Sequence, residues 1–253
     1  CDPVMLEVFN NLFMSIAEQM GITLQNTAYS VNIKERLDFS CAIFNPNGML
    51  VANAPHIPIH LGSMSESIRT VLTENRGVMK PGDVYVVNAP YNGGTHLPDV
   101  TAITPVFDKA ADSILFFVAS RGHHADIGGR TPGSSPPDSK TVEEEGILFD
   151  NFKMVDAGNF LEDKLRAHLA SGPYPARQPD HNVADLKAQI AAGEKGVRET
   201  RRMIDAFGLD VVHAYMGHVQ DNAEEQVRRV IEVMSNGEFG YDLDEGGHIH
   251  VKI

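Results

Sequence analysis

The chain of 253 residues is long enough for one large domain or two small ones, and 42% hydrophobic and 22% charged residues are ordinary for a globular protein. The formal net charge of −13 argues against nucleic acid or an anionic membrane surface as the main partner. The longest apolar run, residues 114–119, is far too short to cross a bilayer.

The first predicted element is a helix. Asp2-Pro3 has the chemistry of an N-cap followed by a first helical residue, and apolar residues recur every four positions over residues 3–20. Gly21 is expected to end this helix. No signal peptide is recognised before it, and Cys1 and Cys41 are too few for a disulfide framework. We therefore expect a reducing, cytoplasmic location and no membrane association.

Strands dominate the next hundred residues or so. Apolar runs bounded by Asn, Pro and Gly predict strands at 39–44 and 49–52 around the turn 45–48, a helix at 62–72, a strand at 84–88, and strands at 100–107 and 114–120. The last two strands form a hairpin. In an antiparallel hairpin, the segment before the first strand lies beside the segment after the second.

The expected fold class is α/β in the mixed α+β sense, with β-hairpins carrying the site loops and a helical second half. Residues 1–130 form the mixed region with the site, and residues 131–182 form a long ordered loop excursion that is rich in Pro, Gly and Ser. Residues 183–236 hold two long helices separated at Gly208, and residues 237–253 begin a β region that looks truncated.

Two glycine-flanked loops carry the most informative residues. The first, residues 92–99, contains His96 and Asp99, and the second, residues 121–129, contains His123. Imidazole and carboxylate are ligands for Zn, Mn or non-haem Fe, and glycine allows close approach of the backbone. Because the hairpin brings the two loops together, the sequence predicts that His96 and His123 are neighbours and share a divalent metal with Asp99. A polar surface loop with an incidental histidine is the alternative for His96.

The second loop offers more candidates than one metal needs. His123 and His124 are adjacent, so an extended backbone cannot direct both into one site. His123 is favoured as the ligand because Gly122 frees its backbone, which leaves His124 to pack or to act on substrate as a catalytic group. Asp126 is a candidate ligand, an orienter of an imidazole or a proton-transfer group, with a cap of the Gly-Gly turn at 128–129 as the alternative.

Further candidates lie outside the two loops. Asp38 stands at a strand start, where it could act as a third ligand or as a general base. Arg36, His60 and Asn92 are candidates for substrate binding, although Arg36 could simply pair with Glu35 in solvent. His60 also precedes residues 62–63, where a helix N-terminus would offer free N–H groups to an anion. Cys41, inside an apolar strand, is interpreted as a core residue rather than a nucleophile.

Neither a Walker sequence nor a dinucleotide-binding glycine pattern occurs, so any ATP must be bound by another domain or chain. Six stretches that span nearly all of the chain are nevertheless informative: KERLDFSCAIF (34–44), NAPHIPIHLGSM (53–64), residues 81–106 with GGTHLPD at their centre, ASRGHHADIGGRTPGS (119–134), DLKAQIAAGEKG (185–196) and GLDVVHAYMGHVQDNA (208–223). Taken together, these stretches resemble the hydantoinase B family.

The resemblance implies an ATP-dependent hydrolase of cyclic amides, either opening 5-oxoproline to glutamate or of the N-methylhydantoinase type. It implies a partner subunit or domain of the hydantoinase A type that binds ATP and Mg, and we expect an oligomer. It also implies metal ligands at His96, Asp99 and His123, with Asp38 as a nearby strand aspartate. Family members are longer than this chain, so we expect it to be an N-terminal part.

Two other functions share these motifs. The first is a subunit of a carboxylase of the acetone or acetophenone type, because such enzymes belong to the same family and would use the same metal site. The second is an inactive, structural half of a larger enzyme, which would complete a complex without holding metal.

Overall fold

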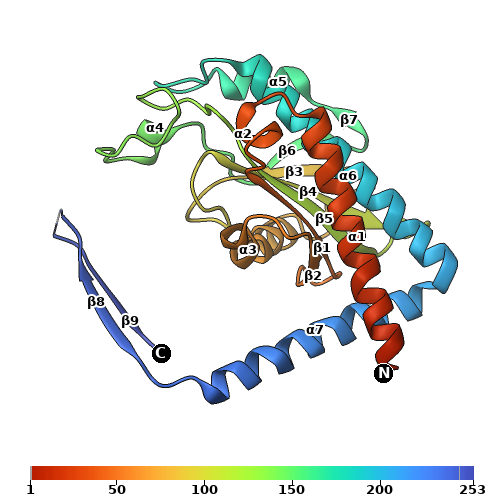
Figure 1. Ribbon diagram of the computed structural model, residues 1–253. Coiled ribbons are helices and arrows are strands. Elements are labelled where there is room, and N and C mark those ends of the chain that lie inside the picture. Colours follow the sequence, from red (N-terminus) through yellow and green to blue (C-terminus); the bar gives the residue numbers. More distant parts are fainter. Residues whose placement is uncertain (1, 245) are drawn as a thin grey trace.

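The computed structural model describes residues 2–244 and 246–253, except for the side chain of Leu61, so Cys1 lies outside the described residues. In this part of the chain seven strands form one antiparallel sheet in the order β2-β1-β5-β4-β3-β6-β7 (Figure 1). The strands are β1 (Phe39–Phe44), β2 (Leu50–Asn53), β3 (Val84–Val87), β4 (Asp99–Phe107), β5 (Ile114–His123), β6 (Phe152–Asp156) and β7 (Asn159–Phe160).

Helices cover both faces of this sheet. The helices are α1 (Pro3–Thr27), α2 (Val31–Lys34), α3 (Pro58–Glu74), α4 (Val142–Glu145), α5 (Glu162–Leu169), α6 (Pro179–Phe207) and α7 (Leu209–Val233). Helix α3 lies on one face, and α1 and α6 lie on the other (Figure 1). The expected mixed α/β class with a helical second half is confirmed.

Side chains alternate along β5 between the two resulting cores. Phe116 and Val118 pack with α1 and α6, whereas Phe117 and Ala119 pack with α3. This alternation follows from the two-residue period of a strand. It explains why the strand reads as a continuous apolar run in the sequence, because both faces of the sheet are buried.

The structure moves two predicted helix boundaries. Helix α1 continues through Gly21 to Thr27, so the expected end at Gly21 is wrong. Gly21 serves close packing instead, because a Cβ there would lie 2.7 Å from the ring of His56. Helix α3 begins at Pro58, so residues 62–63 lie inside the helix and the free N–H groups expected of them are used within it.

The stretch 131–182 contributes more regular structure than a loop. It contains α4, β6, β7 and α5, and β6 pairs with β3 through a register that places Val155 opposite Val84. Strand β7 is only two residues long and pairs with β6. The sheet therefore extends by two strands that the sequence pattern did not indicate.

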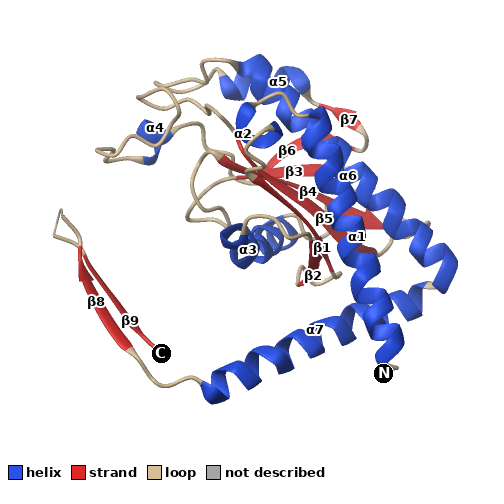
Figure 2. Ribbon diagram, viewed as in Figure 1, coloured by secondary structure: helices blue, strands red, loops and turns tan. Residues whose placement is uncertain are grey.

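The C-terminal elements stand away from the sheet (Figure 2). Helix α7 follows α6 directly, as predicted, and leads to a hairpin of β8 (Glu238–Asp242) and β9 (His248–Lys252). Every residue of these two strands is exposed. Among the described residues, no helix has both the length and the apolarity needed to cross a membrane.

Candidate metal centre

Three strand ends meet at one edge of the sheet and carry the candidate ligands. Strands β4 and β5 pair so that Asp99, the first residue of β4, lies opposite His123, the last residue of β5. Strand β1 is the other neighbour of β5, and the N–H of His123 donates to the carbonyl of Asp38, just before β1. The hairpin predicted from the sequence is therefore present, and its open end gathers these residues.

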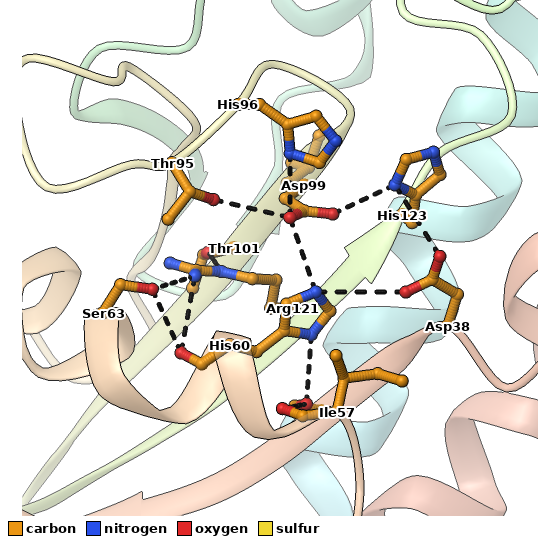
Figure 3. Close-up of polar contacts among 12 residues, drawn as sticks. Asp38, Ile57, His60, Ser63, Thr95, His96, Asp99, Thr101, Arg121 and His123 are labelled. Carbon is orange, nitrogen blue, oxygen red and sulfur yellow. Dashed lines mark hydrogen bonds and ion pairs between the residues drawn. The ribbon is translucent and has the colours of Figure 1, made fainter. Parts of the chain in front are cut away.

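His96, Asp99 and His123 form a compact cluster (Figure 3). Nδ1 of His96 lies 2.9 Å from Oδ2 of Asp99, and Nδ1 of His123 lies 3.1 Å from Oδ1. The two imidazole rings are 5.2 Å apart between centroids, so the predicted proximity of His96 and His123 is confirmed. One nitrogen or oxygen from each residue can be chosen so that all three atoms lie within 4.8 Å of one another.

Asp38 and His60 surround this cluster from β1 and α3. Oδ2 of Asp38 lies 3.8 Å from Nδ1 of His123. Nε2 of His60 lies 3.4 Å from Oδ2 of Asp99 and 3.9 Å from Oδ1 of Asp38. On its other side the His60 ring is held by Ser40, with 3.1 Å between Nδ1 and Oγ.

The carboxylate of Asp99 is the electrostatic centre of the site. Burial alone would raise its pKa, but hydrogen bonds from His123, His60 and His96 outweigh burial and hold the pKa well below its usual range. The hydrogen bond to Asp99 in turn raises the pKa of His96, against the opposing effect of burial. Asp99 is therefore ionised throughout the neutral range and is oriented by its neighbours.

The glycine pair before His96 allows the loop to fold against the body of the protein. The Gly94 N–H donates to the carbonyl of Ala89, and a Cβ on Gly94 would lie 2.2 Å from the carbonyl oxygen of Asn88. Asn88 is buried and donates to the carbonyls of Leu97 and Ile147. These contacts fix the path of the chain into His96, which agrees with the close approach expected of the glycines.

Comparison with known proteins gives this geometry a context. The model of the Hydantoinase B/oxoprolinase family matches residues 2–253. The chain belongs to this family. It is 53% identical over 230 residues to the 5-oxoprolinase of Dictyostelium discoideum, which covers 91% of this chain and 18% of that protein. It is 51% identical over 243 residues to 5-oxoprolinase 1 of Arabidopsis thaliana, which covers 93% of this chain and 19% of that protein.

A solved structure has the same fold. The ATP-dependent caprolactamase from Pseudomonas jessenii superposes with a TM-score of 0.86 at 27% identity, covering 100% of this chain and 44% of that chain. The chain thus spans about a fifth of the length of the two 5-oxoprolinases and under half of the caprolactamase chain. The hydantoinase B resemblance inferred from the motifs is confirmed.

The donor set of this hydantoinase B chain fits a divalent metal. Two imidazoles and one ionised carboxylate converge, and Asp38 adds a second carboxylate whose side chain is 37% exposed. Such a set suits Zn²⁺, Mn²⁺ and Fe²⁺. From outside the three candidate ligands, Nε2 of His60 and Oγ1 of Thr95 each lie 3.4 Å from Oδ2 of Asp99, an arrangement typical of metal-ligand carboxylates.

The other candidates from the second loop lie away from this cluster. His124 is fully buried on the opposite side of the strand, with Nε2 3.2 Å from Oε1 of Gln189 and Nδ1 3.1 Å from Nδ2 of Asn182. Oδ1 of Asp126 accepts from the N–H of Gly128, and Oδ2 pairs with Arg177 at 2.8 Å. The structure brings neither His124 nor Asp126 to the cluster, because alternation along the strand and the turn at 128–129 direct them elsewhere.

The three residues expected to bind substrate also occupy separate places. Arg36 is exposed and lines a groove of about 460 Å³ that does not include the cluster residues. Nδ2 of Asn92 donates to Glu74 and Asp150, at 2.7 and 2.6 Å. His60 lies beside the cluster, where only 3% of the residue is exposed and its ring contacts Asp99.

Cys41 and Arg121 are two of the fully buried residues of the sheet. Burial raises the pKa of the Cys41 thiol, in line with the interpretation as a core residue. Arg121 lies beside the cluster, and it was missed as a functional candidate. The available signal was its spacing, because Arg121 and His123 are two residues apart on one strand and so share a face.

Proposed function

We propose that this chain is the metal-bearing part of an ATP-dependent hydrolase that opens the cyclic amide 5-oxoproline to glutamate. The cluster of His96, Asp99 and His123 at the joined ends of β4 and β5 is the observation that carries the proposal. The substrate assignment is supported by more than 50% identity to two 5-oxoprolinases. The resemblance in fold to a caprolactamase, which by name also acts on a lactam, points to the same class of reaction.

In this proposal each residue has a defined part in the chemistry. His96, Asp99 and His123 would hold the metal, which when bound supplies a Lewis acid and lowers the pKa of water. His60 keeps the carboxylate of Asp99 in place from below. Asp38 lies beside the cluster and is more exposed than Asp99, so its Oδ atoms accept the proton released during hydrolysis.

ATP is assigned to a partner in the same proposal. The sequence carries no phosphate-binding glycine pattern, and its 5-oxoprolinase relatives are about five times as long as the matched region. We therefore place ATP and Mg²⁺ on a hydantoinase A-type domain or subunit that activates the amide. In this proposal the assembly is an oligomer located in the cytoplasm.

Metal content tests the proposal most directly. Elemental mass spectrometry of the wild-type protein should find about one Zn or Mn per chain, and His96→Ala should lose it because one of three ligands is gone. His181→Ala is the matched control, because the His181 ring packs against Tyr29 away from the cluster and its loss should leave the metal in place. Wild-type protein that holds no metal when prepared without chelator would refute the metal assignment.

Substrate identity needs the assembled enzyme. With its ATP-binding partner, the wild-type protein should release ADP in the presence of 5-oxoproline and produce glutamate, whereas His96→Ala should do neither. ADP release that depends on acetone and bicarbonate, with none on 5-oxoproline, would instead identify a carboxylase.

A further inference from the structure

Arg121 is a fully buried guanidinium on β5, two residues before His123. Its Nε donates to Oγ1 of Thr101 at 2.8 Å. Its Nη1 donates to Oγ of Ser63 at 2.5 Å, with a longer contact of 3.5 Å to the carbonyl of His60. Its Nη2 donates to Oγ of Ser67 at 2.9 Å. Figure 3 shows the side chain lying beneath the cluster, between Thr101 and Ser63.

These partners belong to segments that carry Asp99 or its neighbour His60, or that contact the loop of His96. Thr101 follows Asp99 by two positions on β4. Ser63 and the carbonyl of His60 lie in the first turns of α3. Ser67 in turn donates a hydrogen bond to the carbonyl of Gly93, in the loop that leads to His96. The guanidinium therefore joins its own strand, β4, α3 and the His96 loop.

Arg121 forms no ion pair with these partners, because all four acceptors are neutral oxygens. Burial lowers the pKa of Arg121 to about 10, and the negative charge of Asp99 opposes that effect. The group is therefore still protonated at neutral pH. The guanidinium has five N–H donors in a rigid planar arrangement, so it can donate to three separate hydroxyls at once. The ammonium group of a lysine cannot reproduce this arrangement.

We propose that Arg121 is a positioning residue that sets the spacing between His96, Asp99 and His123 by tying together the segments that carry them. It does not touch substrate. The inference rests on the proposed function only in the claim that this spacing serves metal binding, since the network itself is independent of any metal. Outer groups that orient ligands typically contribute a factor of about 10–100 to metal affinity.

Titration calorimetry with Mn²⁺ and the visible spectrum of the Co²⁺-loaded protein test this role. Arg121→Met should weaken Mn²⁺ binding by about 10–100-fold and change the Co²⁺ bands, which report ligand geometry. Arg121→Lys keeps the charge without the fork and should remain several-fold weaker than the wild type. Wild-type affinity in either variant would overturn the proposal.

Two further variants separate positioning from general loss of stability. Ser67→Ala removes only the link from Nη2 to Gly93 and should weaken Mn²⁺ binding by a few-fold while the protein stays folded. Asp83→Asn disrupts a buried charge network in the same sheet, distant from the cluster, and should lower the melting temperature with unchanged Mn²⁺ affinity. If Asp83→Asn weakens binding as much as Arg121→Met does, stability alone explains the effect and the positioning role fails.

Nuclear magnetic resonance of the metal-free protein keeps this test independent of the proposed function. If the wild-type protein binds no metal, the metal assignment fails, but the rings of His96 and His123 can still be observed. In that case Arg121→Met should move their ring resonances and Asp83→Asn should not. Unchanged ring resonances in Arg121→Met would overturn the positioning role itself.

Discussion

At the scale of single residues, two buried aspartates illustrate two uses of charge. Asp99 gathers three imidazoles around one carboxylate, an arrangement suited to a ligand site. Asp83 instead accepts hydrogen bonds from Lys153, from Oη of Tyr85 and from backbone N–H groups, and its side chain is fully buried. The carboxylate of Asp83 therefore has hydrogen-bond partners within the protein at both oxygens, which indicates a structural role.

Replacement of Asp83 by Asn should lower the free energy of unfolding by about 2–3 kcal/mol, because it leaves Lys153 without its main partner. The value lies at the low end for buried pairs, since Lys153 is partly exposed and also contacts Asp156. Urea unfolding followed by circular dichroism measures the change. Lys153→Met removes the other charge, and a double variant that loses no more than either single variant would confirm that the two act as a pair.

The carboxylate of Asp83 also makes the free energy of unfolding depend on pH. Burial would raise the pKa of Asp83, but the hydrogen bonds from Lys153 and the backbone outweigh it and lower the pKa below the ordinary 3.8. A lowered folded-state pKa stabilises the protein above the unfolded-state value, and this contribution is lost as pH falls below about 4. The difference in unfolding free energy between wild type and Asp83→Asn should therefore shrink from pH 6 to pH 3.

The sequence predicted the cluster residues at this scale but not the whole site. His96, Asp99 and His123 could be placed together because a hairpin joins their strands, and hairpin pairing is a local property. His60 was a candidate and the strand spacing placed Arg121 on the face of His123, but their contacts with Asp99, Ser63 and Ser67 could not be predicted, because these depend on how α3 docks on the sheet. The choice of His123 over His124 agrees with the geometry, since neighbouring side chains on a strand face opposite ways.

At the scale of elements, a glycine in the sequence did not by itself show where a helix ends. Gly21 was expected to end a helix but lies inside α1, and Gly193 and Gly196 lie inside an unbroken α6. In each of these places another part of the protein approaches closely. A single sequence does not distinguish a glycine that ends a helix from a glycine that allows another segment to pack closely, because the difference lies in the tertiary contact.

Gly196 allows α6 to approach α1, and its replacement tests this packing. A Cβ at position 196 would lie 2.5 Å from Sδ of Met20, so Gly196→Ala should lower the free energy of unfolding by about 1–3 kcal/mol despite the better helix propensity of Ala. Gly217→Ala in α7 is the matched control, since a Cβ at position 217 would have no atom within 4 Å among its neighbours in the described chain. That variant should gain up to about 1 kcal/mol, and equal effects in both would contradict the packing argument.

At the scale of the whole molecule, helix α7 has a buried face in its first half and is exposed in its second half. Val212, Met216 and Val219 are buried in the core formed with α1 and β1, whereas every residue from 221 to 233 is exposed. Every residue of strands β8 and β9 beyond it is exposed as well. The sequence predicted both long helices from their apolar period, but the period continues beyond residue 219 and so does not show where packing stops.

Two truncations test whether the metal centre and the core are independent of this C-terminal arm, residues 221–253. A chain ending at residue 220 keeps the buried face of α7 and should unfold within about 1 kcal/mol of the full chain, with the same metal content, because residues 221–244 and 246–253 are exposed. A chain ending at residue 208 also loses Val212, Met216 and Val219 and should be less stable by several kcal/mol, at about 1.5–3 kcal/mol for each buried side chain. Loss of metal in the chain ending at residue 220 would show that the arm supports the site, and the separation of core and arm would then be wrong.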